Sequence, residues 1–253
     1  MDGQLAAWET QTLRLTAFPS PSAQIIRPTW WRELMGDEPE SSISQPRKGG
    51  LQEEGVYENG KLVLVFEPTR IHWLYTPMDD EKQQAKDFLT IGPLRDALST
   101  FIPLMNRWFE LETCPSVQRL ALGAIVLQPV QDLQTGYQQL MQYLNSVQFD
   151  VDNSSDFLYQ INRRRDSTVV PGLRINRLSK WSVAAMQRQM ISMQIASVPT
   201  RHEVSPLYFA CRLELDINTV PEFQHEFDRG MLSPILQELA DLGLEIVNQG
   251  DIP

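Results

Sequence analysis

Apolar and polar residues alternate along much of the chain, and this period of two is typical of β-strands that bury one face. The alternation is clearest in the middle of the chain, at 157–161, 173–175 and 181–195. We interpret these stretches as three consecutive strands. Turn-forming residues separate the first two, at Asp166-Ser167-Thr168 and at Pro171-Gly172.

A β-meander is predicted between residues 51 and 76. The segments 51–57 and 61–66 flank Asn59-Gly60, and 70–76 adds a third strand. Asn-Gly favours a tight hairpin because both residues tolerate the positive φ angles of a type I′ turn. Further strands are expected at 10–17, 118–127 and 208–217.

Apolar residues at helical spacing lie between these strands. They predict a short helix at 27–35 and a longer one at 93–109. Pro103 lies inside the second, so we expect a kink or a break there. A third helix is expected to follow Asp132, whose side chain can cap its first turn.

The end of the chain predicts two more helices. Thr219 and Glu222 form a capping box, which predicts a helix that Gly230 ends. A last helix is expected to begin at Ser233 and to end at Gly243. Strands and helices together indicate an α+β protein, with antiparallel sheets covered by helices on one side.

Two segments suggest an internal relationship. Residues 119–144 and 212–236 share an Arg-Leu-x-Leu strand, a proline-containing turn and a helix. This similarity favours two related β-rich lobes, an N-terminal α+β lobe at 1–150 and a C-terminal one at 151–253. Residues 36–50 are polar and contain two prolines and three glycines, so we expect a mobile loop there.

Two adjacent tryptophans, Trp30 and Trp31, lie on the short helix before this loop. The side chains of adjacent helix positions point in different directions, so we expect that Trp30 and Trp31 cannot both face inward. One of them is therefore a candidate anchor for a protein partner. The alternative, which adjacent aromatic residues show more often, is packing at the edge of the core.

Composition and charge narrow the class of protein. The 253 residues suffice for a substantial core, and a net charge of −10 argues against a general nucleic-acid coat. The first residues have neither the basic nor the apolar region of a signal peptide. No apolar run approaches the ~20 residues of a membrane-spanning helix. We therefore expect a cytoplasmic protein that does not associate with a membrane.

The basic residues are concentrated in one region of this acidic chain. Residues 154–201 hold eight basic and two acidic residues. Such a patch could steer an anion or a nucleic acid to the central strands. The alternative is that these residues pair with the acidic remainder of the chain. The candidate anion-binding residues are Arg163, Arg164, Arg165, Arg174, Arg177 and Lys180.

Few residues stand in patterns that indicate catalysis. Cys114 and Cys211 have no CxxC neighbour, so we interpret them as small buried apolar side chains. His72 lies in an apolar strand and is expected to be a satisfied strand histidine. Glu214 and Asp216 share one face of a strand and could hold Mg²⁺, which leaves a divergent metal-dependent hydrolase as one hypothesis.

Other motifs give no support for an enzyme. One Glu222-x-x-His225 spacing is too little for a di-metal site, which takes that motif from two helices. The chain has neither a phosphate-binding glycine loop nor a nucleophile elbow. We therefore predict no catalytic residue, no metal and no cofactor.

Several short motifs resemble a sporadically distributed family of uncharacterised bacterial proteins of about this length. They are Pro28-Thr29-Trp30-Trp31 and, within 156–218, Gln160–Arg163, Arg174–Leu178 and the closing strand that ends in Leu215-Asp216-Ile217-Asn218. Genes for members of that family often lie near mobile elements or defence genes. The resemblance therefore implies a role in antiviral defence or genome conflict.

Three hypotheses about function follow. The leading one is a non-catalytic binding subunit or adaptor of a bacterial protein complex, with another protein subunit as partner. The second is an anion- or nucleic-acid-binding module that uses the basic strands at 160–190. The third is the metal-dependent hydrolase built on Glu214 and Asp216.

Overall fold

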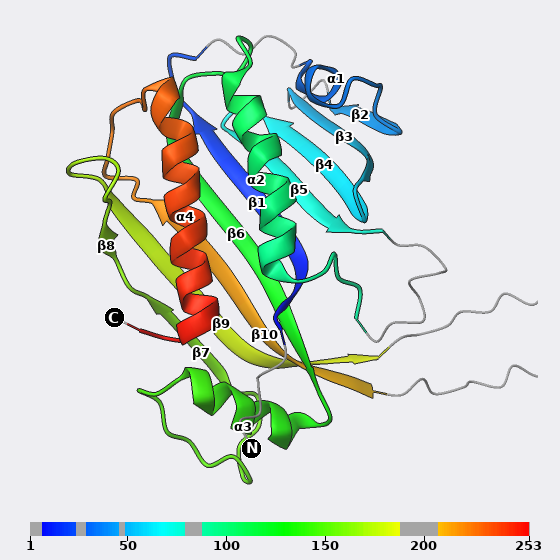
Figure 1. Cartoon of the computed structure of the whole chain (residues 1–253), viewed down its shortest axis with the longest axis vertical. Helices are drawn as coiled ribbons and strands as arrows, with labels where there is room; N and C mark the ends of the chain where they lie inside the picture. The colour runs from blue at the N-terminus through cyan, green and yellow to red at the C-terminus, as the bar shows by residue number, and fades with distance from the viewer. Residues whose placement is uncertain (1–6, 24–28, 46–48, 79–87, 188–206, 253) are drawn as a thin grey trace, which may run out of the picture.

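A ten-stranded antiparallel sheet forms the centre of the protein in the computed structural model (Figure 1). The structure describes residues 7–23, 29–45, 49–78, 88–187 and 207–252. The strands lie in the order β2-β3-β4-β5-β1-β6-β10-β9-β7, and β8 also pairs with β9. Their bounds are β1 (Glu9–Pro19), β2 (Ser41–Gln45), β3 (Gly50–Tyr57), β4 (Gly60–Glu67), β5 (Arg70–Pro77), β6 (Val117–Val130), β7 (Leu158–Asn162), β8 (Arg165–Asp166), β9 (Arg174–Gln187) and β10 (Leu207–Thr219).

Helices pack on one face of this sheet. They are α1 (Trp30–Met35), α2 (Leu94–Glu110), α3 (Leu133–Tyr143) and α4 (Arg229–Gln249). The long helices α2 and α4 run side by side across the middle of that face (Figure 1). Leu98 of α2 and Ala240 of α4 meet the strand residues Leu13, Leu122 and Leu215, which forms the central core. The predicted α+β class, with helices on one side of antiparallel strands, is confirmed.

The order of elements occurs twice along the chain. Apart from the short strands β2 and β8, a strand, a helix, a three-stranded meander and a long helix appear first as β1-α1-β3-β4-β5-α2 and again as β6-α3-β7-β9-β10-α4. In both units the first strand pairs with the last strand of the meander. The units meet where β1 pairs with β6, so one sheet runs through both.

This repeat differs from the relationship that the sequence suggested. The segments 119–144 and 212–236 correspond to β6 with α3 and to β10 with α4, which occupy different places in their unit. The expected boundary at residue 150 lies between α3 and β7, inside the second unit. The order of the strands and helices therefore shows a repeat that short sequence motifs did not indicate.

Most predicted strands and the three earlier helices are present, with the hairpin at Asn59-Gly60 and the helix after Asp132. The two segments 173–175 and 181–187 join into the single long strand β9, and 188–195 lies outside the described residues. Helix α2 continues through Pro103. Within the predicted mobile loop at 36–50, residues Ser41–Gln45 form β2 and pair with β3.

The predicted helix at Thr219 is wrong, and so are the bounds of the last helix. Thr219 is the buried last residue of β10, where its hydroxyl accepts from the Leu120 N–H at 3.0 Å instead of capping a helix. Helix α4 runs from Arg229 to Gln249 and passes through Gly243. A Cβ at Gly243 would lie 3.7 Å from Ile217, which is an ordinary van der Waals contact, so this helix position faces β10 and has room for a side-chain carbon. Gly250, with φ near 79°, ends the helix.

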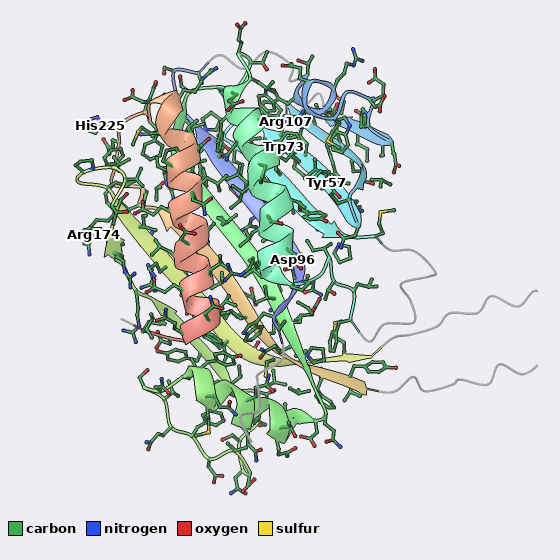
Figure 2. All side chains as sticks on the ribbon, in the orientation of Figure 1. Tyr57, Trp73, Asp96, Arg107, Arg174 and His225 are labelled. Atoms are coloured by element: carbon green, nitrogen blue, oxygen red, sulfur yellow. The ribbon has the colours of Figure 1, made fainter. Side chains whose placement is uncertain are left out.

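The tryptophan pair also corrects a prediction, because Trp30 and Trp31 are both buried. Trp30 packs edge-on against Trp108 of α2, and its indole N–H donates to the Thr113 carbonyl at 3.1 Å. Trp31 stacks on Trp73, which lies beneath α2 (Figure 2). Because α1 contacts both α2 and the sheet, the side chains at two adjacent positions of α1 can both be buried. Neither indole presents a surface to a partner.

Candidate functional site

The face of the sheet opposite the helices carries both polar and apolar side chains around a hollow. Along each strand, alternate residues point to that face because the side chains of a strand alternate. On β1 these are Thr12, Arg14 and Thr16, while Leu13 and Leu15 face the helices. We call it the uncovered face, since all four helices contact the other one.

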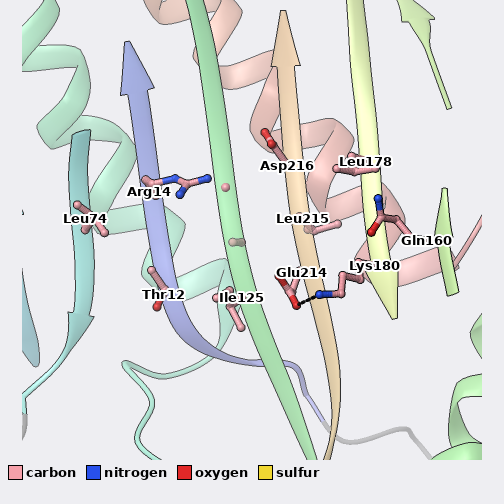
Figure 3. Close-up of a pocket in the computed structure, with 12 residues that line it drawn as sticks. Thr12, Arg14, Leu74, Ile125, Gln160, Leu178, Lys180, Glu214, Leu215 and Asp216 are labelled. Atoms are coloured by element: carbon pink, nitrogen blue, oxygen red, sulfur yellow. Dashed lines mark ion pairs between the residues drawn. The ribbon is translucent and has the colours of Figure 1, made fainter. Parts of the chain in front are cut away.

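A hollow of about 360 Å³ lies at the centre of the uncovered face. It crosses the strands from β5 to β7 (Figure 3). Gly123 lies at its middle, paired with Arg14 on one side and with Asp216 on the other. The side chains around it are those of Thr12, Arg14, Leu74, Ile125, Gln160, Leu178, Lys180, Glu214 and Asp216. A glycine inside a strand commonly marks a place where another group approaches the backbone closely.

Glu214 is held by two cations at one end of the hollow. The Lys180 ammonium lies 3.0 Å from its carboxylate, and the Arg212 guanidinium also donates to it. All three side chains are about one-third exposed or less. Glu214 is therefore a paired structural carboxylate, which weakens its availability as a metal ligand.

Arg14 and Asp216 differ from Glu214 in their surroundings. The Arg14 guanidinium lies over Gly123, where an added Cβ would be 3.3 Å from Nη2 and 3.4 Å from Nε. Asp216 accepts a hydrogen bond of 3.1 Å from the Asn218 amide. Within the described ranges, neither Arg14 nor Asp216 forms an ion pair. The hollow therefore has one uncompensated positive group and one uncompensated negative group.

His72 lies on the same face, one row further along β5. Its Nδ1 is 3.0 Å from the Thr16 hydroxyl, which confirms the expected satisfied histidine. Burial lowers the pKa of His72, and the positive charges of Arg14 and Arg70 lower it further. Both effects favour the neutral imidazole.

Three of the basic residues expected to bind an anion lie on the helix side of the sheet. Arg163 forms a bidentate ion pair with Asp251, at 2.6 and 2.8 Å. Arg165 and Arg177 both pair with Glu245 of α4, at 2.7 and 3.3 Å. The Arg177 side chain is only 1 % exposed, and burial lowers its pKa. These contacts attach the second unit's strands to the end of the chain.

The other three are dispersed. Arg164 lies 3.7 Å from Glu222, and Arg174 lies 3.5 Å from Asp166 at the rim of the molecule (Figure 2). Lys180 points to the uncovered face, where it pairs with Glu214. The six residues therefore do not form one surface. The remaining basic residues of the patch, Arg188 and Arg201, lie outside the described residues.

The remaining candidates are the possible metal ligands, His225 and the two cysteines. No group of three His, Cys, Asp or Glu side chains suited to a metal occurs in the ranges that the structure describes. His225 is exposed and lies in a non-helical segment, so it does not share a helix face with Glu222. Cys114 and Cys211 are buried and free, and burial raises the pKa of each thiol to about 12. Both behave as the expected small apolar side chains.

Sequence reasoning missed Arg14 and Gly123. The one available signal was a glycine inside the strongly apolar segment 118–127, since glycine weakens a strand unless its lack of a side chain is used.

None of the four described helices is long and apolar enough to cross a membrane. Comparison with family models, curated proteins and solved structures found no match.

Proposed function

We propose that the protein is a non-catalytic binding subunit of a bacterial protein complex, and that a partner protein docks on the β2 end of the uncovered face. The observation that carries this proposal is an aliphatic patch on β3–β5, which we define as Val56, Val63, Val65 and Leu74. The role in antiviral defence rests on the family resemblance alone.

The strand register places these four side chains on one face, where Val63 is only 9 % exposed and the Lys61–Glu54 ion pair lies between Val63 and Val56. Val63 and Leu74 are directly opposite each other on β4 and β5. Val65 follows Val63 by two positions on the same face, and Val56 is the diagonal neighbour of Val63 on β3. Val56 is 50 % exposed, and Ile43 on the neighbouring edge strand is 53 % exposed. Grouped apolar side chains on a surface commonly mark a protein interaction site.

The edge strand β2 adds backbone groups to this surface. Its five residues, Ser-Ser-Ile-Ser-Gln, contain neither a charge nor a proline, which are the usual means of blocking an edge. Its outer N–H and C=O groups can pair with an extended segment of a partner. We therefore expect a partner segment that adds a strand beside β2 and places apolar side chains over Ile43 and Val56.

The buried tryptophans support this surface from the other side. A Cβ at Gly55 of β3 would lie 3.0 Å from the Trp31 ring, so β3 rests directly on that indole. Arg107 of α2 donates to the Leu34 carbonyl at 2.8 Å and fixes the end of α1. The tryptophans then act through the strands they support rather than by touching the partner.

The test is co-purification from the cells in which the protein is natively expressed, with wild type, Ile43→Lys and Leu158→Lys. Leu158 is a matched control because it is 57 % exposed and lies on the uncovered face at the opposite edge. We expect one stoichiometric partner with wild type and with Leu158→Lys, and its loss with Ile43→Lys. Hydrogen exchange of the complex should then show slower exchange at 41–45.

Three outcomes would overturn the proposal. The first is a partner that Ile43→Lys retains and Leu158→Lys loses. The second is the absence of any stoichiometric partner. The third is self-association of the purified protein that Ile43→Lys abolishes, measured by light scattering, because it would make a second copy the occupant of β2.

A further inference from the structure

The central hollow carries an inference that does not depend on the protein partner. It lies at the seam of the two structural units, where β1 of the first pairs with β6 of the second. Because Gly123 has no side chain, the Arg14 guanidinium can lie directly over its backbone at the centre of the hollow.

The charges of the hollow are arranged in one row across the sheet. Leu74, Arg14, Gly123 and Asp216 are successive cross-strand partners. Since adjacent strands lie about 4.8 Å apart, the backbones of Arg14 and Asp216 are separated by roughly 9.6 Å. Gly123 contributes no side chain between them. The Arg14 side chain therefore reaches over Gly123 toward the strand that carries Asp216 (Figure 3).

The neighbouring row shows what a satisfied arrangement looks like. There Glu214 holds Lys180 at 3.0 Å and also pairs with Arg212. In the described part of the chain, Arg14 and Asp216 have no such partners. Arg14 is exposed and Asp216 is half-buried, so both can form charge-assisted hydrogen bonds with an ionised ligand. The row of Gly123 thus offers one anion-binding and one cation-binding group to the same occupant.

We propose that this hollow binds a small zwitterion, a molecule such as a free amino acid that carries a carboxylate and an ammonium group. The carboxylate pairs with Arg14 and the ammonium group with Asp216. Leu74, Ile125 and Leu178 supply apolar contacts for a short side chain. A ligand with only a negative charge would be repelled by Asp216, and a ligand with only a positive charge would be repelled by Arg14.

The experiment is ligand-observed NMR with the full-length protein and an equimolar panel of the twenty protein amino acids, β-alanine and γ-aminobutyrate. The panel member that binds best is then compared with its amide, which lacks the carboxylate, and its N-acetyl form, which lacks the ammonium group. We expect saturable binding of the zwitterion and about tenfold to a hundredfold weaker binding of each analogue, the range for one charged hydrogen-bonding contact.

Two charge-removing variants assign each charge. Asp216→Asn should remove the preference for the zwitterion over its N-acetyl form, and Arg14→Gln should remove the preference over its amide. Gly123→Val should abolish binding because it fills the space under Arg14. Ile43→Lys leaves the hollow intact, so it should bind the zwitterion like wild type and separates this site from the proposed docking surface.

The proposal is overturned if no panel member binds at millimolar concentration. It is also overturned if the amide or the N-acetyl form binds as well as the zwitterion. Unchanged selectivity in both Arg14→Gln and Asp216→Asn would overturn it as well. Circular dichroism checks that each variant is folded, and the two charge-removing variants decide the outcome if Gly123→Val does not fold.

Discussion

Asp251 is expected to stabilise the fold more than any exposed carboxylate of the chain. Its side chain is 2 % exposed and accepts from both Arg163 nitrogens, at 2.6 and 2.8 Å. It also accepts from the Tyr159 hydroxyl at 2.6 Å and from Ser146 at 3.2 Å. These donors come from β7, from the segment after it and from the segment after α3. One carboxylate thus joins the end of α4 to three other parts of the second unit.

The Asp251→Asn substitution keeps the shape and removes the charge. Breaking a buried ion pair from one side costs about 3–5 kcal/mol. Water can reach Arg163, whose side chain is 28 % exposed, and that reduces the loss. We therefore expect a decrease of about 2–3 kcal/mol in the free energy of unfolding. With a urea slope of about 3 kcal/mol/M, the unfolding midpoint should fall by about 0.7–1 M.

Urea unfolding at pH 7, followed by circular dichroism, measures this difference. Glu38→Gln is the control, because the Arg32–Glu38 pair is about two-thirds exposed and such pairs contribute under ~1 kcal/mol. A midpoint for Asp251→Asn within 0.2 M of wild type, roughly the uncertainty of such midpoints, would refute the reasoning.

The same pair predicts a pH dependence. The hydrogen bonds from Arg163 hold the pKa of Asp251 below its usual range. A carboxyl with a lowered folded-state pKa stabilises the protein above its unfolded-state pKa of about 3.9, and the stabilisation is lost as pH falls below it. The gap between wild type and Asp251→Asn should therefore be full at pH 7 and should shrink below about pH 4. A gap that stays constant down to pH 3 would contradict this linkage.

Three further predictions concern close packing and the thiols. Gly136→Ala places a Cβ 2.8 Å from Val183 and should cost about 1–3 kcal/mol in urea unfolding, part of which Val183→Ala should restore. Gly250→Ala combines a φ of 79° with a Cβ 2.0 Å from a backbone oxygen at the end of α3, so thermal unfolding should show a loss of about 2 kcal/mol or more. Cys114 and Cys211 should react with a disulfide reagent at pH 8 only at the rate of unfolding, because both thiols are buried with a pKa of about 12; rapid reaction of the folded protein would contradict their burial.

The parts of the fold that local chemistry determines were predictable. Strand periodicity located β1, β3–β7 and β10, and Asn59-Gly60 located the hairpin between β3 and β4. The Asp132 side chain does accept from the Thr135 N–H, at 2.8 Å, as the helix cap expected there. Each of these signals depends on residues within a few positions of one another.

The parts that tertiary contacts decide were not predictable in the same way. Thr219 has the sequence context of a helix cap, but a strand 99 residues away uses its hydroxyl. Gly243 resembles a helix end, but α4 continues through it, with this position facing β10. Trp30 and Trp31 are both buried because α1 has protein on two sides, which a single helix does not reveal. Tertiary packing overrides local preference at such positions.

The basic residues show the same limit of sequence-based prediction, here for the candidate site. Arg177 and Lys180 are three positions apart on β9, so their side chains point to opposite faces. A cluster of charge in the sequence is thereby divided, with Arg177 buried against α4 and Lys180 at the central hollow. Conversely, Gly123 is about a hundred residues from both Arg14 and Asp216 in the sequence, and the sheet register alone makes it the neighbour of both.

The repeated order of elements explains why the hollow has its position and its chemistry. Arg14 and Gly123 are cross-strand partners near the midpoints of β1 and β6, the first strands of the two units. Their outer neighbours, Leu74 on β5 and Asp216 on β10, hold equivalent places in the two units. Each unit therefore supplies one charge, but from different strands: the first from its first strand, the second from its last. A symmetric pair of units would place like groups face to face across the seam, and this difference is what gives the hollow two opposite charges around a bare glycine.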